Sequence, residues 1–227
     1  MGATTVVESS ARLLSFWDTT LGKKVVMALT GFILFGFVLA HMLGNLQIFL
    51  GPEALNGYAL QLREHPVLLW FARLVLLVAV ALHMAAAIQL ARLRAAARPV
   101  SYEHHAHTVS TFSSRHMLLS GAMIAAFVVY HLLHFTWGTV HPQFQHLRPY
   151  ENVVAGFRST PVAAAYIVAM VLLGIHLHHG MWSIFQTLGL SHPRYTPWFK
   201  RFAAAMATVI TLGFISVPLA VLAGVVS

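Results

Sequence analysis

Histidines interrupt four long apolar runs of this 227-residue sequence, at His41, His83, His131 and His176. A neutral imidazole binds a metal ion through one ring nitrogen while the other nitrogen donates a hydrogen bond, which suits a site in an apolar environment. A single histidine of this kind is as readily explained by a hydrogen bond between helices or by a proton relay. Four of them on four successive runs favour a shared metal or cofactor site.

The positions of these histidines along their runs divide them into two pairs. At 1.5 Å per residue, His41 and His131 lie about 25 Å and 24 Å beyond the basic residues that precede their runs. His83 and His176 lie about 14 Å and 24 Å before the arginine or histidine that follows theirs. Successive helices cross a membrane in opposite directions. The expected depths therefore place His41 and His131 together, towards the outer face. They place His83 and His176 together, towards the cytoplasm.

Two bis-histidine sites at different depths are typical of a cytochrome b with two haem b groups. Axial histidines on both sides of haem iron leave no position for oxygen, which favours electron transfer over oxygen activation. Zinc fits less well, because the histidines form no tight cluster of four ligands. The chain has no cysteine, which excludes disulfides, thiolate-held iron–sulfur clusters and covalently attached c-type haem.

Two further histidines leave the choice of ligand open. His134 and His179 each follow an expected ligand by three residues, and residues three apart share one face of a helix. On spacing alone, either member of each couple can bind the iron. His104, His105 and His107 form a separate group that we expect in a solvated cytoplasmic loop.

A few charged residues have candidate roles around the expected haems. Arg73 lies inside the second apolar run, where a charge is costly unless it is paired. Arg73, Arg92 and Arg115 are candidate partners for haem propionates. Glu64, at the outer end of the second run, can accept a proton from a quinol or can equally be a loop residue at the level of the lipid headgroups.

The composition indicates a membrane protein. Hydrophobic residues make up 58% of the chain and charged residues 9%, whereas a soluble domain of this size carries about a quarter charged residues. The formal net charge is +8, but the basic residues lie between apolar runs. Topology and lipid headgroups therefore explain the charge better than nucleic acid does.

The predicted fold is all-α, a single transmembrane domain spanning residues 1–227. A helix needs about 20 apolar residues to cross the hydrocarbon. Five stretches meet this length, at residues 24–49, 66–90, 117–140, 161–187 and 202–226. Lys and Arg are concentrated at the N-terminus and in the second and fourth connections, which predicts a cytoplasmic N-terminus.

A short repeat supports the idea of a shared site. Thr30-Gly31 precedes His41 with the same separation as Ser120-Gly121 precedes His131. Both helices are expected to run outward, so the two segments read as two halves of one binding site.

At these residues the chain resembles the dihaem cytochrome b anchor subunit of succinate dehydrogenases and fumarate reductases. The resemblance runs from about residue 21 to the fifth apolar run. It is carried by LAHMLGN at 39–45 with ALN at 54–56, ALH at 81–83, SG at 120–121 with YHL at 130–132, and IH at 175–176 followed by GMWS at 180–183. The family places its ligands where His131 and His176 stand, which selects them over His134 and His179.

The resemblance implies an anchor for two soluble subunits in a bacterial inner membrane. Those cytoplasmic partners are a flavoprotein subunit with FAD and an iron–sulfur subunit. This chain does not oxidise succinate itself but contributes the site for a quinone, often menaquinone. Gly174 stands where some fumarate reductases of the family have a glutamate linked to proton transfer across the membrane.

Two other functions share some of these features. A cytochrome b anchor of a hydrogenase or formate dehydrogenase would keep the haems and change the partners. A transporter or proton channel would use the histidines as relays, but the apolar runs lack the carboxylates that such a pathway needs.

Overall fold

The computed structural model describes residues 16–97 and 112–227, which form helices and connecting turns without a strand. Five helices in this part of the chain are long and apolar enough to cross a membrane. They are α1 (Thr20–Asn45), α3 (Pro66–Ala96), α5 (Met117–His131), α7 (Thr160–Thr187) and α8 (Thr196–Leu222). The prediction of an all-α, multi-pass fold is confirmed at this level. His104, His105 and His107 lie outside the described residues.

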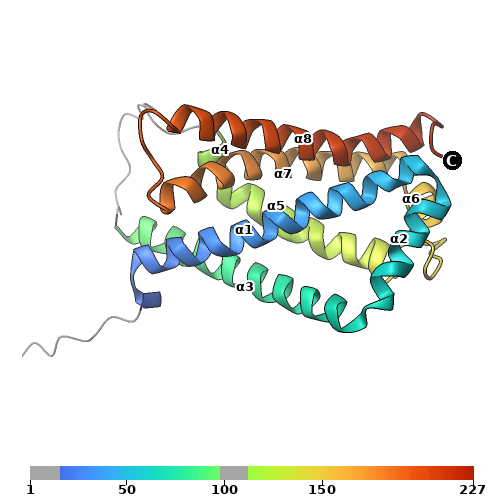
Figure 1. Ribbon diagram of the computed structural model, residues 1–227, viewed down its shortest axis with the longest axis horizontal. Helices are drawn as coiled ribbons and strands as arrows, with labels where there is room; N and C mark the ends of the chain where they lie inside the picture. Colours follow the sequence, from blue (N-terminus) through green and yellow to red (C-terminus); the bar gives the residue numbers. More distant parts are fainter. Residues whose placement is uncertain (1–15, 98–111) are drawn as a thin grey trace, which may run out of the picture.

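The five helices run lengthwise in one elongated bundle (Figure 1). α7 packs along α8, α5 packs along α7, and α1 contacts α3, α7 and α8. α3 is attached mainly through α1, and its fully buried residues are the small Ala79 and Ala86, seven residues apart. Small residues let two helices approach closely within a membrane.

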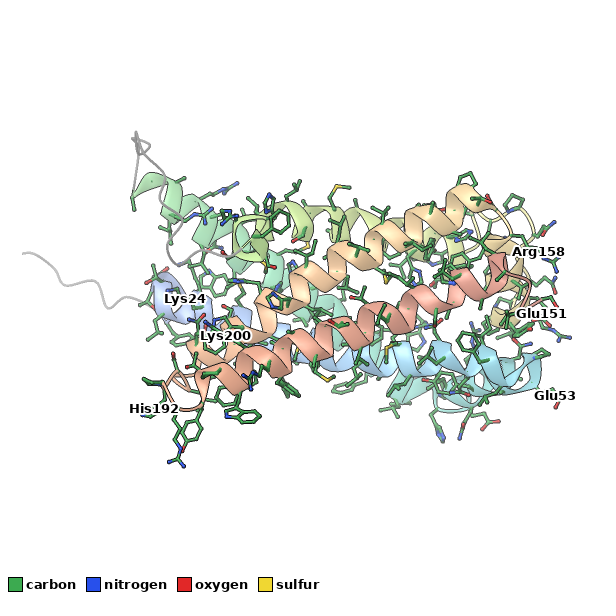
Figure 2. The ribbon with its side chains drawn as sticks, turned by 90° about the horizontal axis from the view of Figure 1, so that it is seen from above. Lys24, Glu53, Glu151, Arg158, His192 and Lys200 are labelled. Atoms are coloured by element: carbon green, nitrogen blue, oxygen red, sulfur yellow. The ribbon has the colours of Figure 1, made fainter. Side chains whose placement is uncertain are left out.

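The two ends of the bundle differ in charge and in covering structure. Figure 2 shows Lys24, His192 and Lys200 at one end, which we call the basic end. The opposite end carries Glu53 and Glu151, together with the short helices α2 (Pro52–Glu64) and α6 (Pro149–Phe157). We call it the capped end. The remaining short elements are η1 (Phe16–Asp18), η2 (Leu46–Leu50), α4 (Phe112–Arg115) and η3 (Leu132–Thr136).

Several helices have different bounds from those expected, and α2 and α6 were not expected at all. Pro52 and Pro149, which were read as breaks between the expected spans, instead lie in the first turns of α2 and α6. Pro66, Pro161 and Pro197 lie in the first turns of α3, α7 and α8. Proline is well suited to that position, because the first N–H groups of a helix have no partner within it. α3 continues six residues beyond the expected end, and α8 begins six residues before the expected start.

The third span ends sooner than expected, by a change in helix type. α5 stops at His131 and gives way to a π-helical turn, η3, so the span ends at Thr136 rather than at residue 140. A π turn alters the direction of the side chains that follow it and is frequent at functional sites. Here it directly follows one of the expected iron ligands.

Asn56 joins the two helices of the capped end. Its side-chain amide donates to Glu151 Oε2 at 2.9 Å, and its carbonyl accepts from the Tyr150 N–H at 3.0 Å. Arg148 adds an ion pair to the other oxygen of Glu151 at 3.2 Å. Burial raises the pKa of the Glu151 carboxyl, but the hydrogen bond from Asn56 and the charge of Arg148 outweigh it. The pKa of Glu151 therefore lies below its usual 4.5.

Replacing Glu151 by Gln is expected to remove a pH-dependent part of the stability. Because the folded-state pKa is depressed, ionised Glu151 stabilises the fold above about pH 4.5, and this contribution is lost as the pH falls further. The difference in melting temperature between wild type and Glu151→Gln in detergent should be full at pH 7 and should shrink below pH 4.5. Glu53→Gln removes the same charge from the same end without those contacts, and it is the control for the loss of charge at pH 7.

Candidate functional site

The bundle brings the four apolar-run histidines together in two facing pairs. The ring centroids of His83 on α3 and His176 on α7 are 6.4 Å apart. Those of His41 on α1 and His131 on α5 are 5.9 Å apart. An imidazole nitrogen binds a first-row metal at about 2 Å, so two rings on opposite sides of one ion have centroids about 6 Å apart. Both pairs therefore have the spacing of two axial ligands.

α1 holds His83 in a defined tautomer. Its Nδ1 lies 3.2 Å from the carbonyl oxygen of Met27, which can only accept, and 3.1 Å from the hydroxyl of Thr30. The Thr30 hydroxyl donates its own proton to the Val26 carbonyl at 2.7 Å, so it too accepts from the ring. Nδ1 therefore carries the proton. The Nε2 lone pair has no hydrogen bond to any described residue and can bind a metal.

α5 holds His176 in the same way. The Ser120 hydroxyl donates to the Met117 carbonyl at 3.2 Å and lies 3.3 Å from His176 Nδ1. The ring proton is again on Nδ1, and the Nε2 lone pair is left available. Both members of this pair are thus neutral donors, which is the state that a metal ion requires.

The repeated segments Thr30-Gly31 and Ser120-Gly121 contact the His83–His176 pair. This differs from the expectation that they form a site with His41 and His131. A Cβ at Gly31 would lie 3.3 Å from His83 Cε1, and one at Gly121 would lie 3.4 Å from His176 Cε1. The repeat therefore does not form a site with the histidines that follow it in sequence, His41 and His131. Adjacency along the chain could not show this, because those histidines lie about 15 Å further along the same helices.

The His41–His131 pair has different surroundings. Tyr166 on α7 places its hydroxyl 3.4 Å from His131 Nδ1. Asn45, one turn beyond His41, places its amide nitrogen 3.3 Å from His41 Nε2 and also donates to the His41 carbonyl at 2.8 Å. Phe37 stacks on the His41 ring with centroids 5.3 Å apart. The Asn45 contact is one that a metal ion at His41 Nε2 would replace.

His134 and His179, the histidines that follow His131 and His176 by three residues, are not part of the facing pairs. His134 is 2% exposed and stacks on His141 with centroids 4.7 Å apart, while its Nδ1 contacts the Tyr166 hydroxyl at 3.0 Å. His179 has no ring contact with His83 within the described chain, whereas His176 does. The structure thus brings His131 and His176, rather than His134 and His179, into the facing pairs.

Arg73 lies at the level of the His41–His131 pair. It precedes His83 on α3 by ten residues, which is about 15 Å along the helix. On α1, His41 lies about 16 Å beyond Thr30, which contacts His83. The Arg73 side chain is exposed in the isolated chain, and its guanidinium stacks over the Trp70 ring at 4.9 Å. A charge at this depth calls for an anionic partner.

The other predicted charged residues lie at the two ends. Arg92 is nine residues beyond His83, about 14 Å towards the basic end, and Arg115 on α4 lies near the same end. Both are exposed. Glu64 is exposed at the end of α2 and forms no hydrogen bond or ion pair with a described residue. The structure does not bring Glu64 into contact with the His41–His131 pair.

The glycine at position 174 is explained by packing. A Cβ there would collide with the hydroxyl of Thr211 on α8. That hydroxyl oxygen is buried and has no hydrogen-bond partner among the described residues. A side chain at position 174 therefore requires Thr211 to turn away or α8 to move.

Comparisons with protein-family models, curated proteins and solved structures found no match to this chain. Among the described residues, no three or more metal-binding side chains gather around one point. A tetrahedral metal site is therefore not formed by this part of the chain. Two imidazoles that face each other across the width of one metal ion fit a group that brings its own equatorial ligands, as haem does.

The roles of Tyr166, Asn45 and His141 were not expected from the sequence. Tyr166 and His141 contact residues outside their own element. Asn45 contacts His41 one turn back on its own helix. For Tyr166 a signal was present, because a tyrosine inside an apolar run needs a partner for its hydroxyl. The identity of that partner depends on how α5 and α7 are aligned.

The hydrogen bonds predict opposite tautomers for histidines in different parts of the bundle. His83 and His176 should be protonated at Nδ1. His141 should be protonated at Nε2, because that nitrogen donates to the Asn152 carbonyl at 2.9 Å while Nδ1 accepts from the Gln143 N–H. Nitrogen-15 NMR of histidine-labelled protein without cofactor, with signals assigned through single His→Gln variants, measures this directly. Nε2 protonation of His83 or His176 would contradict the assignment.

Proposed function

We propose that the chain is a membrane cytochrome b, the anchor subunit of a succinate:quinone oxidoreductase. It carries electrons between an iron–sulfur subunit and membrane quinone through two bis-histidine b haems. The observation that supports this most is the presence of two facing histidine pairs, each at the spacing of axial ligands and each at its own level of an apolar bundle.

The separation of the two pairs suits electron transfer across the bundle. Thr30, which contacts His83, and His41 are eleven residues apart on α1, so the two sites are about 16 Å apart along the helix axis. Haem, when bound, supplies an iron that exchanges one electron. The residues of the chain would hold each haem by two imidazole nitrogens and surround it with apolar side chains, which would control its redox potential.

The distribution of charge supports a cytoplasmic basic end. Lysines and arginines within the described part of that end are Lys23, Lys24, Arg92, Arg94, Arg115, Arg194, Lys200 and Arg201. The capped end has three arginines and three glutamates, namely Arg63, Arg148, Arg158, Glu53, Glu64 and Glu151. Cytoplasmic segments of membrane proteins carry an excess of basic residues. The N-terminus would then be cytoplasmic, in a bacterial inner membrane.

This orientation assigns a role to each pair. His83 and His176 lie nearer the basic end, where the flavoprotein subunit with FAD and the iron–sulfur subunit would dock. His41 and His131 lie nearer the capped end. Arg73 is at their level and could pair with a haem propionate, and Arg92 and Arg115 could do so at the other pair. We propose that quinone, with menaquinone favoured, reacts near the capped end, with Glu64 as a candidate proton acceptor.

The purified complex is expected to contain two low-spin b haems for each copy of this chain. His83→Ala or His176→Ala should remove one of them, and His41→Ala or His131→Ala should remove the other, because each variant deletes one axial ligand. Reduced-minus-oxidised absorption spectra and haem quantification measure both effects. Loss of the same haem from His83→Ala and His131→Ala would reject the pairing.

One variant serves as a matched control. His179→Gln alters a histidine that lies three residues after His176 and has no ring contact with His83, and it should leave two haems bound. The subunits that copurify test the partner assignment. FAD and iron–sulfur clusters are expected, whereas nickel or molybdenum would indicate a hydrogenase or formate dehydrogenase anchor. A complex with all its subunits but without haem would contradict the proposal.

A further inference from the structure

A chain of polar groups leads from His131 away from the facing pair. The Tyr166 hydroxyl lies 3.4 Å from His131 Nδ1 and 3.0 Å from His134 Nδ1. A phenol has one proton, so it donates to one of these nitrogens and accepts from the other. The two possible directions have opposite consequences for His131.

Only one direction is compatible with iron binding through Nε2 of His131. In that direction, His131 donates its Nδ1 proton to the Tyr166 oxygen, and Tyr166 donates its own proton to His134 Nδ1. In the reverse direction, Tyr166 donates to His131 Nδ1, and the ring proton of His131 must then occupy Nε2, where it blocks a metal. The state of His134 therefore decides which nitrogen of His131 is free.

Ring contacts on the His134 side chain fix the position of its Nδ1 beside Tyr166. Its ring lies between neighbours, with Tyr130 stacked at 5.4 Å and 13° and His141 stacked at 4.7 Å and 21°. His141 is in turn fixed by two backbone groups, the Asn152 carbonyl and the Gln143 N–H. A buried side chain with this many ring contacts has little freedom to turn its Nδ1 away from Tyr166.

On the basis of the proposed function, we infer that Tyr166 is a positioning residue for His131, and that His134 directs the Tyr166 proton. Together they hold His131 in the tautomer that binds iron, and the Tyr166 oxygen accepts a hydrogen bond from the His131 Nδ1–H. A hydrogen bond donated by the nitrogen that does not bind the metal makes an imidazole a stronger donor to that metal. A phenol that itself donates a hydrogen bond is a better acceptor, so His134 strengthens the effect.

The two proposed haem sites differ in the group that accepts the histidine Nδ1 hydrogen bond. The His83–His176 site can therefore serve as an internal reference. His83 and His176 donate to aliphatic hydroxyls that are bonded to backbone carbonyls, with a further carbonyl at His83. Tyr166 is about ten residues from His176 along α7, which places it about 15 Å away. A change at Tyr166 should therefore alter one haem and leave the other as it was.

Tyr166→Phe in the intact complex tests the inference through a redox titration followed by absorption and electron paramagnetic resonance. Losing the acceptor weakens the donation from His131 and favours reduced iron. The ratio of reduced to oxidised haem at the His41–His131 site, measured at a fixed ambient potential, should rise several-fold. The haem at the His83–His176 site should be unchanged. Loss of the first haem alone would also support the inference.

Tyr130→Phe is the matched control, because it removes a hydroxyl from a tyrosine that stacks on His134 and has no hydrogen bond to His131. It should shift neither haem. His134→Phe keeps the stacking and removes the acceptor, so it should shift the same haem in the same direction as Tyr166→Phe. The double variant should shift it no further than Tyr166→Phe alone, because the two residues act in series.

Three outcomes would overturn the inference: an unchanged potential in Tyr166→Phe, an equal shift or loss of both haems, or the same shift in Tyr130→Phe. All three presuppose a wild-type complex that carries two haems. A wild type without haem would contradict the proposed function itself, so the two failures are distinguishable.

Discussion

Every neutral imidazole in an apolar bundle has two ring nitrogens that require different partners. A neutral ring has one N–H to donate and one lone pair to share, and in hydrocarbon no water supplies either partner. At His83 and His176 the protein provides an acceptor for the N–H, and the centroids of the two rings lie 6.4 Å apart. The arrangement of the helices follows from this requirement, because donors and acceptors from four spans have to meet at two levels.

The direction of each helix determines which residues share a level. α1 and α5 run from the basic end to the capped end and supply Thr30 and Ser120 at one level. α3 and α7 run the opposite way and supply the histidines there. At the other level the roles are exchanged, because α1 and α5 supply the histidines and α7 supplies Tyr166. Four helices thus provide two sites of similar plan but unequal chemistry. One pair is contacted by aliphatic hydroxyls, and the other by a phenol and an amide.

Much of this could be predicted from the sequence, since length and apolar character alone identify five spans. Counting residues from the basic ends also brought the right histidines together, because a regular helix converts sequence number into depth. Counting could not tell how one helix is rotated against another. It therefore assigned Thr30-Gly31 and Ser120-Gly121 to the histidines on their own helices instead of those opposite. It also missed α2 and α6, because a proline that begins a helix looks the same in sequence as one that ends it.

The attachment of α3 has a consequence for how the molecule is assembled. This helix is joined to the bundle mainly through α1, along a strip of small residues that includes Ala79 and Ala86, yet it carries the ring that faces His176 on α7. A bulky side chain at either alanine would push α3 outward and widen the gap between His83 and His176 without altering any residue of the site. The geometry of the His83–His176 pair therefore depends on buried helix-contact positions that bear no polar group of their own.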